Sequence, residues 1–119
     1  IVSDSSITIY HNPRCLKSRQ TLELIRAAGT EPIVVEYLKN PPSSEELDEL
    51  LRKLDLEPLG LMRQKEAIFQ EMDLADKDLA RDEVIDVMIE NPVLIERPIV
   101  VRGCKAVIGR PPENVQELL

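Results

Sequence analysis

The first third of the chain alternates short apolar runs with a helical pattern of apolar positions. Residues 7–10, Ile-Thr-Ile-Tyr, combine β-branched and aromatic side chains and indicate a strand that breaks at Asn12-Pro13. Regularly spaced apolar positions then predict a helix from about residue 16 to a glycine stop at Gly29. Residues 33–38 form a nearly continuous apolar run, which predicts a second strand buried on both faces. Strand, helix and strand together make a βαβ unit.

The middle of the chain has a helical pattern throughout. The segment Asn40-Pro41-Pro42 ends the second strand, and Ser43 and Glu46 after it have the spacing of a capping box. Leucines spaced i, i+3, i+4, i+7 then indicate an amphipathic helix. Further apolar positions predict a helix over about residues 61–72 and another from about Asp82 to Asn91-Pro92. The helical block therefore spans about residues 43–91. Its leucine stripe comprises Leu47, Leu50, Leu51 and Leu54.

The end of the chain returns to strands. Residues 99–102 and 105–108 are apolar and β-branched, and they flank Gly103-Cys104, a two-residue loop of the kind that a type II′ hairpin prefers. A short terminal helix follows, with proline in its first turn. The order β-α-β, helical block, β-β-α predicts an α/β protein with a four-stranded mixed sheet. This is the thioredoxin-like (glutaredoxin-like) arrangement with an inserted all-helical block.

Length and composition fit one globular domain. The chain has 119 residues, of which 43% are hydrophobic, enough for one ordinary core and too few for two. We expect this domain to span residues 7–119, with residues 1–6 a disordered arm or a remnant of expression. The net charge of −7 argues against a nucleic-acid partner or an anionic membrane surface. No run of side chains has the length and apolarity of a membrane span.

Cysteine and histidine usage narrows the chemistry further. The two cysteines, Cys15 and Cys104, are far apart in sequence, and His11 is the single histidine. These residues supply neither a disulfide framework nor a metal site, so no metal is expected. A reducing, cytoplasmic compartment is the natural expectation. Cys104 falls at the predicted hairpin tip, and we interpret it as an incidental thiol rather than a resolving cysteine.

Cys15 is the candidate nucleophile. It falls where the first strand turns into the first helix, so free backbone N–H groups and the helix dipole favour an anion there. The cationic neighbours Arg14, Lys17 and Arg19 also favour thiolate over thiol. The Ser18 hydroxyl, three residues on, is expected to donate to the sulfur. His11 would favour the thiolate if protonated, or would be a loop residue that packs the turn.

Several motifs in register carry a family resemblance. From Ile7 to Leu119 the chain resembles the arsenate reductase family of the glutaredoxin-coupled (ArsC) type, and in particular its short, chromosomally encoded members. The motifs are His11-Asn12-Pro13-Arg14-Cys15-Leu16-Lys17-Ser18-Arg19, Leu38-Lys39-Asn40-Pro41-Pro42, Leu61-Met62-Arg63, Asn91-Pro92-Val93-Leu94-Ile95-Glu96-Arg97-Pro98-Ile99 and Ile108-Gly109-Arg110-Pro111.

This resemblance implies a function, a partner set and a site. The thiolate of Cys15 would attack arsenate, glutathione would react with the adduct as co-substrate, and glutaredoxin would resolve the mixed disulfide, completing reduction to arsenite. Arsenical resistance is the implied role, and no bound cofactor is implied. Guanidinium groups bind such tetrahedral oxyanions by paired hydrogen bonds. The implied site comprises the oxyanion-binding arginines Arg63, Arg97 and Arg110, the thiolate-stabilising His11 and Ser18, and a cis-proline bond at Arg97-Pro98.

Two other functions fit the same pattern. Arg14 and Leu16 stand where the well-known arsenate enzymes carry a small residue and a glycine. A thiol oxidoreductase acting on another oxyanion, or on glutathionylated protein, is therefore an alternative. A redox-linked regulator that binds RNA polymerase is the other, because a related family of regulators shares the fold. Those regulators carry a second cysteine three residues after the first, and this chain has Ser18 there, which counts against an intramolecular switch.

Overall fold

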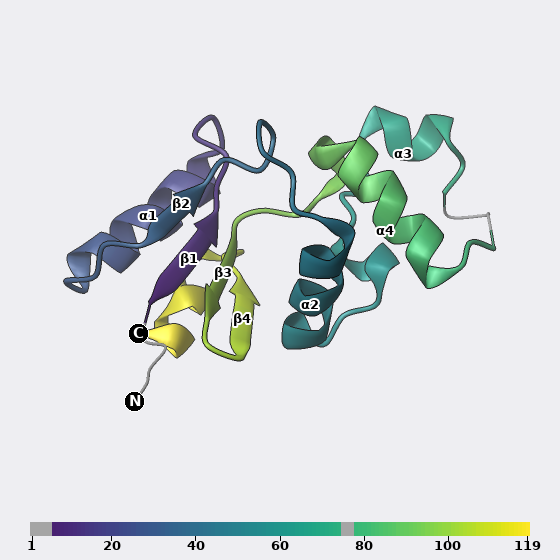
Figure 1. Ribbon diagram of the computed structural model, residues 1–119. Coiled ribbons are helices and arrows are strands. Elements are labelled where there is room, and N and C mark those ends of the chain that lie inside the picture. Colours follow the sequence, from purple (N-terminus) through teal and green to yellow (C-terminus); the bar gives the residue numbers. More distant parts are fainter. Residues whose placement is uncertain (1–5, 75–77) are drawn as a thin grey trace. The chain divides into compact units, whose positions relative to one another are not determined.

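The computed structural model describes residues 6–74 and 78–119. These residues group into two compact units (Figure 1). The first combines the chain up to Asn40 with Arg97–Leu119, and the second is Pro41–Glu96. The predicted helical block, residues 43–91, falls within the second unit. The predicted N-terminal arm lies outside the described residues except for Ser6, which has no regular structure.

The first unit is built on the predicted four-stranded mixed sheet. Strand β1 (Ile7–Tyr10) pairs in parallel with β2 (Ile33–Val35) and antiparallel with β3 (Ile99–Arg102), which pairs antiparallel with β4 (Lys105–Ile108). The strand order is therefore β2-β1-β3-β4. The fold class predicted from the sequence is confirmed.

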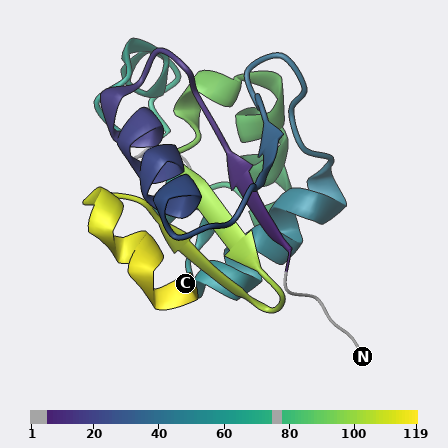
Figure 2. The ribbon, with the colours of Figure 1, turned by 90° about the vertical axis from the view of Figure 1, so that its left-hand side faces the viewer.

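Two helices pack on this sheet side by side (Figure 2). They are α1 (Leu16–Ala27) and the terminal 3₁₀ helix η3 (Pro112–Leu118). Apolar side chains from the central strands and from both helices meet in one cluster. Burial of this cluster stabilises the unit and fixes the start of α1 against the sheet. The buried members are Ile7, Ile9, Ile25, Val100, Val115 and Leu118.

The prediction that the second strand is buried on both faces is wrong. Strand β2 ends at Val35, and residues Ile33 and Val34 are 57% and 38% exposed. The reason is its position: β2 is an edge strand that pairs only with β1. The apolar run that suggested burial continues into a turn, where Tyr37 is buried.

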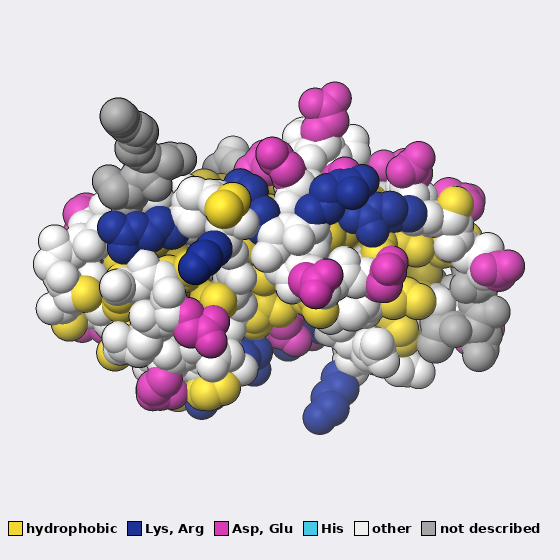
Figure 3. Space-filling view, turned by 90° about the horizontal axis from the view of Figure 1, so that it is seen from below, with side chains coloured by type: hydrophobic (Ala, Val, Ile, Leu, Met, Phe, Trp, Pro, Cys, Tyr) yellow, Lys and Arg dark blue, Asp and Glu magenta, His cyan; other side chains and the backbone are white. Residues whose placement is uncertain are grey.

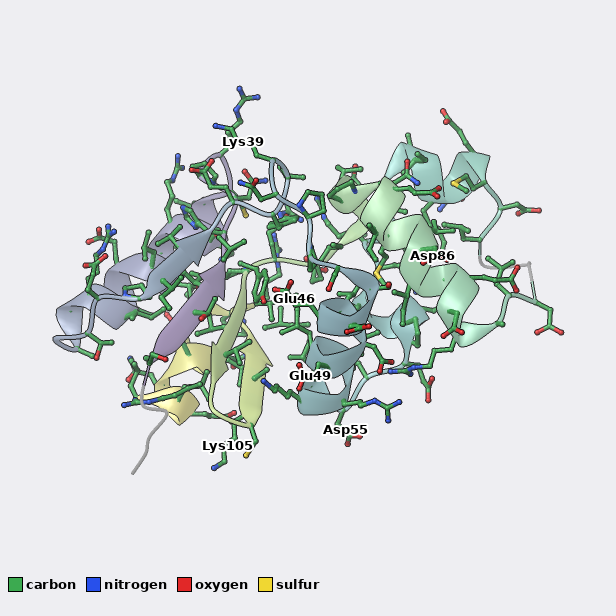
Figure 4. The ribbon with its side chains drawn as sticks, in the orientation of Figure 1. Lys39, Glu46, Glu49, Asp55, Asp86 and Lys105 are labelled. Carbon is green, nitrogen blue, oxygen red and sulfur yellow. The ribbon has the colours of Figure 1, made fainter. Side chains whose placement is uncertain are left out.

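The hairpin between β3 and β4 has the predicted two-residue loop. Gly103 has φ +61°, whereas Cys104 is not among the residues with positive φ. One positive φ at the first loop position distinguishes a type II′ turn from type I′, which needs two. Lys105, which begins β4, extends from this hairpin (Figure 4).

The second unit is helical. It contains α2 (Ser44–Leu54), α3 (Ala67–Glu71), α4 (Arg81–Glu90) and the 3₁₀ helices η1 (Pro58–Leu61) and η2 (Pro92–Leu94). The Ser43 hydroxyl accepts the Glu46 N–H at 3.1 Å, as the capping-box spacing predicts. Leu47, Leu50 and Leu51 are buried. The prediction of one continuous helix over residues 61–72 is wrong, because the chain there divides into η1 and the shorter α3.

Charged side chains occupy exposed positions of these helices. Figure 4 labels Glu46 and Glu49 on α2, Asp55 at its C-terminal end and Asp86 on α4. Acidic and basic side chains are interspersed on the face drawn in Figure 3. Among residues 6–74 and 78–119, no helix combines the length and apolarity needed to cross a membrane.

Candidate active site

Cys15 is the residue that opens α1. Its own conformation is extended, with φ −94° and ψ 123°, and the first helical residue is Leu16. Its N–H donates to the carbonyl of Asn12 at 3.0 Å, and its carbonyl accepts the Arg19 N–H at 3.0 Å. The side chain is 8% exposed. The sulfur therefore lies, as predicted, at a helix start where backbone N–H groups are available.

Several groups of the first unit act on the thiol of Cys15. Burial raises its pKa and is the largest single influence, because it disfavours the charged form. The Ser18 backbone N–H, the charge of Arg97, the Lys17 backbone N–H and a hydrogen bond from the Arg97 side chain all lower it. The net effect is a pKa below the ordinary value of a cysteine thiol. The thiolate is thus favoured by the helix start and by one arginine.

Arg97 and Arg110 come together at this sulfur. Nη2 of Arg110 lies 3.7 Å from Sγ of Cys15, and Nε of the same guanidinium donates to the Arg97 carbonyl at 2.9 Å. The peptide bond between Arg97 and Pro98 is cis, as the resemblance implied, and that between Arg110 and Pro111 is cis as well. Two of the three predicted arginines therefore lie beside Cys15.

Gly109 brings the segment of Arg110 close to α1. Its N–H donates to the Pro98 carbonyl at 2.9 Å. A Cβ at this position would lie 2.5 Å from Oγ1 of Thr21 and 2.8 Å from Cγ of Pro98. Only glycine allows so close an approach, so the residue before Arg110 is fixed by packing against α1 and the cis-proline. Gly109 belongs to one of the family motifs, but the motif did not predict this packing role, and no pattern in the sequence pointed to Thr21.

Ser18 is buried in the first turn of α1, but its hydroxyl has other partners than predicted. Its Oγ lies 2.6 Å from Nδ1 of His11 and accepts the N–H of Asn12 at 3.0 Å. The group of Ser18 that lowers the pKa of the Cys15 thiol is its backbone N–H rather than the expected hydroxyl. The hydroxyl holds the loop of residues 11–15 in place, because its partners stand at the beginning of that loop.

His11 is buried, which decides its charge. Burial is the main cause that lowers the pKa of the imidazole; Glu36 opposes it, and Arg26 and Arg19 add to it. The neutral form is favoured at neutral pH, and the protonated form considered from the sequence is disfavoured. Contact with Ser18 makes His11 part of the packing beneath the Cys15 loop.

Arg63, the third predicted arginine, belongs to the second unit. It follows η1 and forms an ion pair with Glu66 at 2.8 Å, with both side chains about one-quarter exposed. Its backbone N–H donates to the Leu94 carbonyl at 2.7 Å. A carboxylate thus already partners this guanidinium within its own unit.

The remaining candidates lie at the surface. Cys104 is a free, exposed thiol at the hairpin tip, and Arg14, Leu16 and Lys17 are exposed around Cys15. Within the described ranges no three His, Cys, Asp or Glu side chains are arranged to hold a metal ion. The chemistry available at the site is that of an activated thiol beside two guanidinium groups.

Known proteins of similar sequence and structure identify the family of this chain. The model of the ArsC family matches residues 10–118. The uncharacterized protein YfgD of Escherichia coli strain K12 is 50% identical over 95% of this chain and 96% of its own length. An arsenate reductase of Escherichia coli is 44% identical over 97% of this chain and 82% of its own. The structure of an arsenate reductase from Vibrio cholerae has a TM-score of 0.94 at 47% identity, covering 98% of this chain and 100% of that one. The chain belongs to the ArsC family.

Proposed function

We propose that this protein is an arsenate reductase in which Cys15 is the nucleophile. The observation that carries the proposal is the position of Arg110, whose guanidinium lies 3.7 Å from the Cys15 sulfur while Arg97 lowers the pKa of the same thiol. A thiolate needs a cationic setting to form, and a tetrahedral oxyanion needs guanidinium donors to bind. Arg97 meets the first need, and Arg97 and Arg110 together meet the second.

The first step joins sulfur to arsenic. The Cys15 thiolate attacks arsenic(V), a sulfur–arsenic bond forms, and one arsenate oxygen leaves as water after taking up protons. Arg97 and Arg110 neutralise charge on the remaining oxygens and orient the arsenate for attack. The backbone N–H groups of Lys17 and Ser18, which stabilise the thiolate before the reaction, act on the same sulfur during attack.

Two external thiols then supply the electrons. The thiolate of glutathione attacks the Cys15 sulfur, and the sulfur–arsenic bond breaks with its electron pair remaining on arsenic, which is released as arsenite. Cys15 is left in a mixed disulfide with glutathione. A glutaredoxin thiol attacks the glutathione sulfur and returns Cys15 as thiolate. One arsenic(V) is reduced by two electrons, and two thiols become one disulfide.

His11 and Ser18 have supporting functions in this proposal. Arg63 is paired with Glu66 in the second unit, and the proposed oxyanion site consists of Arg97 and Arg110. His11 and Ser18 stabilise the thiolate indirectly. Their contact at 2.6 Å, and the bond from the Asn12 N–H to the Ser18 hydroxyl, hold the loop that presents the backbone N–H groups to sulfur.

Arsenite production by the purified protein tests the proposal. With glutathione and glutaredoxin supplied, we expect the wild type to reduce arsenate and Cys15→Ser to reduce none. Cys104→Ser is the matched control, since it removes the exposed thiol and should retain wild-type activity. A folded wild-type protein with no arsenite formation above background would reject the assignment. Activity retained by Cys15→Ser would reject the nucleophile.

A further inference from the structure

The segment that carries Arg110 is held by a side chain outside the site described above. Nδ2 of Asn114 donates to the carbonyl of Ile108 at 3.1 Å and to that of Arg110 at 3.2 Å. These two carbonyls lie on either side of Gly109. One side-chain amide therefore closes the turn between the end of β4 and the cis bond that follows Arg110.

The Asn114 side chain is carried by helix η3, which the core holds in place. Asn114 is exposed, but its neighbours Pro112, Val115 and Leu118 are buried, and the last two belong to the apolar cluster of the first unit. The Asn114 backbone N–H also donates to the Pro111 carbonyl at 3.0 Å. Because the core anchors η3, the Asn114 side chain transmits this rigidity to residues 108–110.

A second set of contacts holds the same segment from the other side. The Gly109 N–H donates to the Pro98 carbonyl, and Nε of Arg110 donates to the Arg97 carbonyl, both at 2.9 Å. These bonds fix the segment to the cis-proline, and the Asn114 amide fixes it to η3. The Arg110 guanidinium reaches the Cys15 sulfur from a main chain held at both sides.

We propose that Asn114 is the positioning residue for Arg110: its amide fixes the Arg110 main chain so that the guanidinium stays over the Cys15 sulfur, where the oxyanion binds. This inference rests on the proposed function for the identity of the ligand. Asn114 acts through Arg110 and does not itself touch the sulfur. Its effect is therefore on oxyanion affinity rather than on formation of the thiolate, which depends on Ser18, Lys17 and Arg97.

Three variants separate this role from general stability. Asn114→Ala removes both N–H donors. Asn114→Asp keeps the size of the side chain but replaces the amide nitrogen by an oxygen, which cannot donate to the two carbonyls. Gln116→Ala, at another exposed position of η3, is the matched control. The first readout is the nuclear magnetic resonance signal of the Arg110 Nε–H. We expect a distinct, slowly exchanging signal in the wild type and in Gln116→Ala, and loss of that signal in both Asn114 variants.

The second readout is oxyanion binding. We expect the KM for arsenate, and the arsenate concentration that half-protects Cys15 from iodoacetamide, to rise about tenfold in Asn114→Ala, as loss of two hydrogen bonds allows. The same variant should change kcat less than KM and leave the Cys15 thiol pKa unchanged. Gln116→Ala should match the wild type in all four measurements.

The possible results are distinguishable. An Arg110 signal and a KM that both match the wild type in Asn114→Ala would overturn the inference. A lower melting temperature with an unchanged KM would also overturn it, because Asn114 would then serve stability alone. If the wild type neither reduces arsenate nor shows protection by it, the proposed function fails. The Arg110 Nε–H signal, which needs no substrate, still decides whether Asn114 holds the arginine.

Discussion

Replacing Gly109 with alanine tests how tightly the arginine-bearing segment packs. The new Cβ would lie 2.5 Å from Oγ1 and 3.1 Å from Cγ2 of Thr21, and 2.8 Å from Cγ of Pro98. Neither neighbour can yield easily. Thr21 is fully buried and its hydroxyl donates to the Lys17 carbonyl at 2.8 Å, while Pro98 is a buried, rigid ring. The conflict must therefore move the backbone or break the Thr21 hydrogen bond.

The size of the effect follows from these contacts. Overpacking a filled site costs about 1–3 kcal/mol, and a lost buried hydrogen bond adds about 1 kcal/mol. We expect Gly109→Ala to lower the free energy of unfolding by about 2–4 kcal/mol and the melting temperature by about 10 °C. Gly60→Ala is the matched control, because its Cβ would meet nothing closer than 3.7 Å and should change stability by less than about 1 kcal/mol.

A double-mutant cycle identifies the cause. Thr21→Ala removes two of the three short contacts at Gly109 but not the one to Pro98. We would measure the free energy of unfolding in urea for the wild type, the two single variants and the double variant. The double variant should be about 1–2 kcal/mol more stable than the sum of the two single effects predicts. Additive effects would refute the proposed collision with Thr21. A Gly109→Ala variant as stable as Gly60→Ala would refute the close packing altogether.

Two further predictions concern ionisation. Since Arg97 lowers the pKa of the Cys15 thiol, Arg97→Gln should raise that pKa and shift the appearance of thiolate absorbance to higher pH. Arg26→Gln, at the far end of α1, should not change it. Equal titration curves for the two variants would contradict the electrostatic role of Arg97. Burial lowers the pKa of His11 in the folded protein, so the unfolded chain binds a proton at a higher pH than the folded chain does. The contribution of His11 to the free energy of unfolding is therefore present above about pH 6.5 and is lost as the pH falls through the folded-state pKa. His11→Gln should flatten this part of the stability profile, and an unchanged slope would refute it.

The strands and helices near Cys15 could be predicted because their signals are local. The apolar run of β1, the break at Asn12-Pro13 and the cationic residues after it place Cys15 at a helix start without reference to the rest of the chain. The burial of β2 could not be predicted this way. Its apolar run is equally compatible with a central and an edge strand, and only pairing with distant strands decides between them.

The details of the site depend on contacts that sequence spacing does not reveal. Ser18 could have donated to the sulfur three residues before it, but His11, seven residues before it, takes the hydroxyl instead. Arg110 could be singled out by its motif, yet its guanidinium is set by the carbonyl of Arg97, and its main chain by the amide of Asn114. Asn114 could have been suspected only from its position four residues after Arg110, a separation that many residues share by chance.

The distribution of acidic residues is a signal for the site that the sequence does contain. The first turn of α2 carries Glu45 and Glu46, and the first turn of α4 carries Asp82 and Glu83. An acidic residue in this position stabilises a helix by about 0.3–1 kcal/mol. The first turn of α1 carries none, in a chain of net charge −7. A carboxylate there would raise the pKa of the Cys15 thiol by like-charge repulsion. The chain therefore gives up this helix stability at the start of α1, where the proposed reaction uses a thiolate.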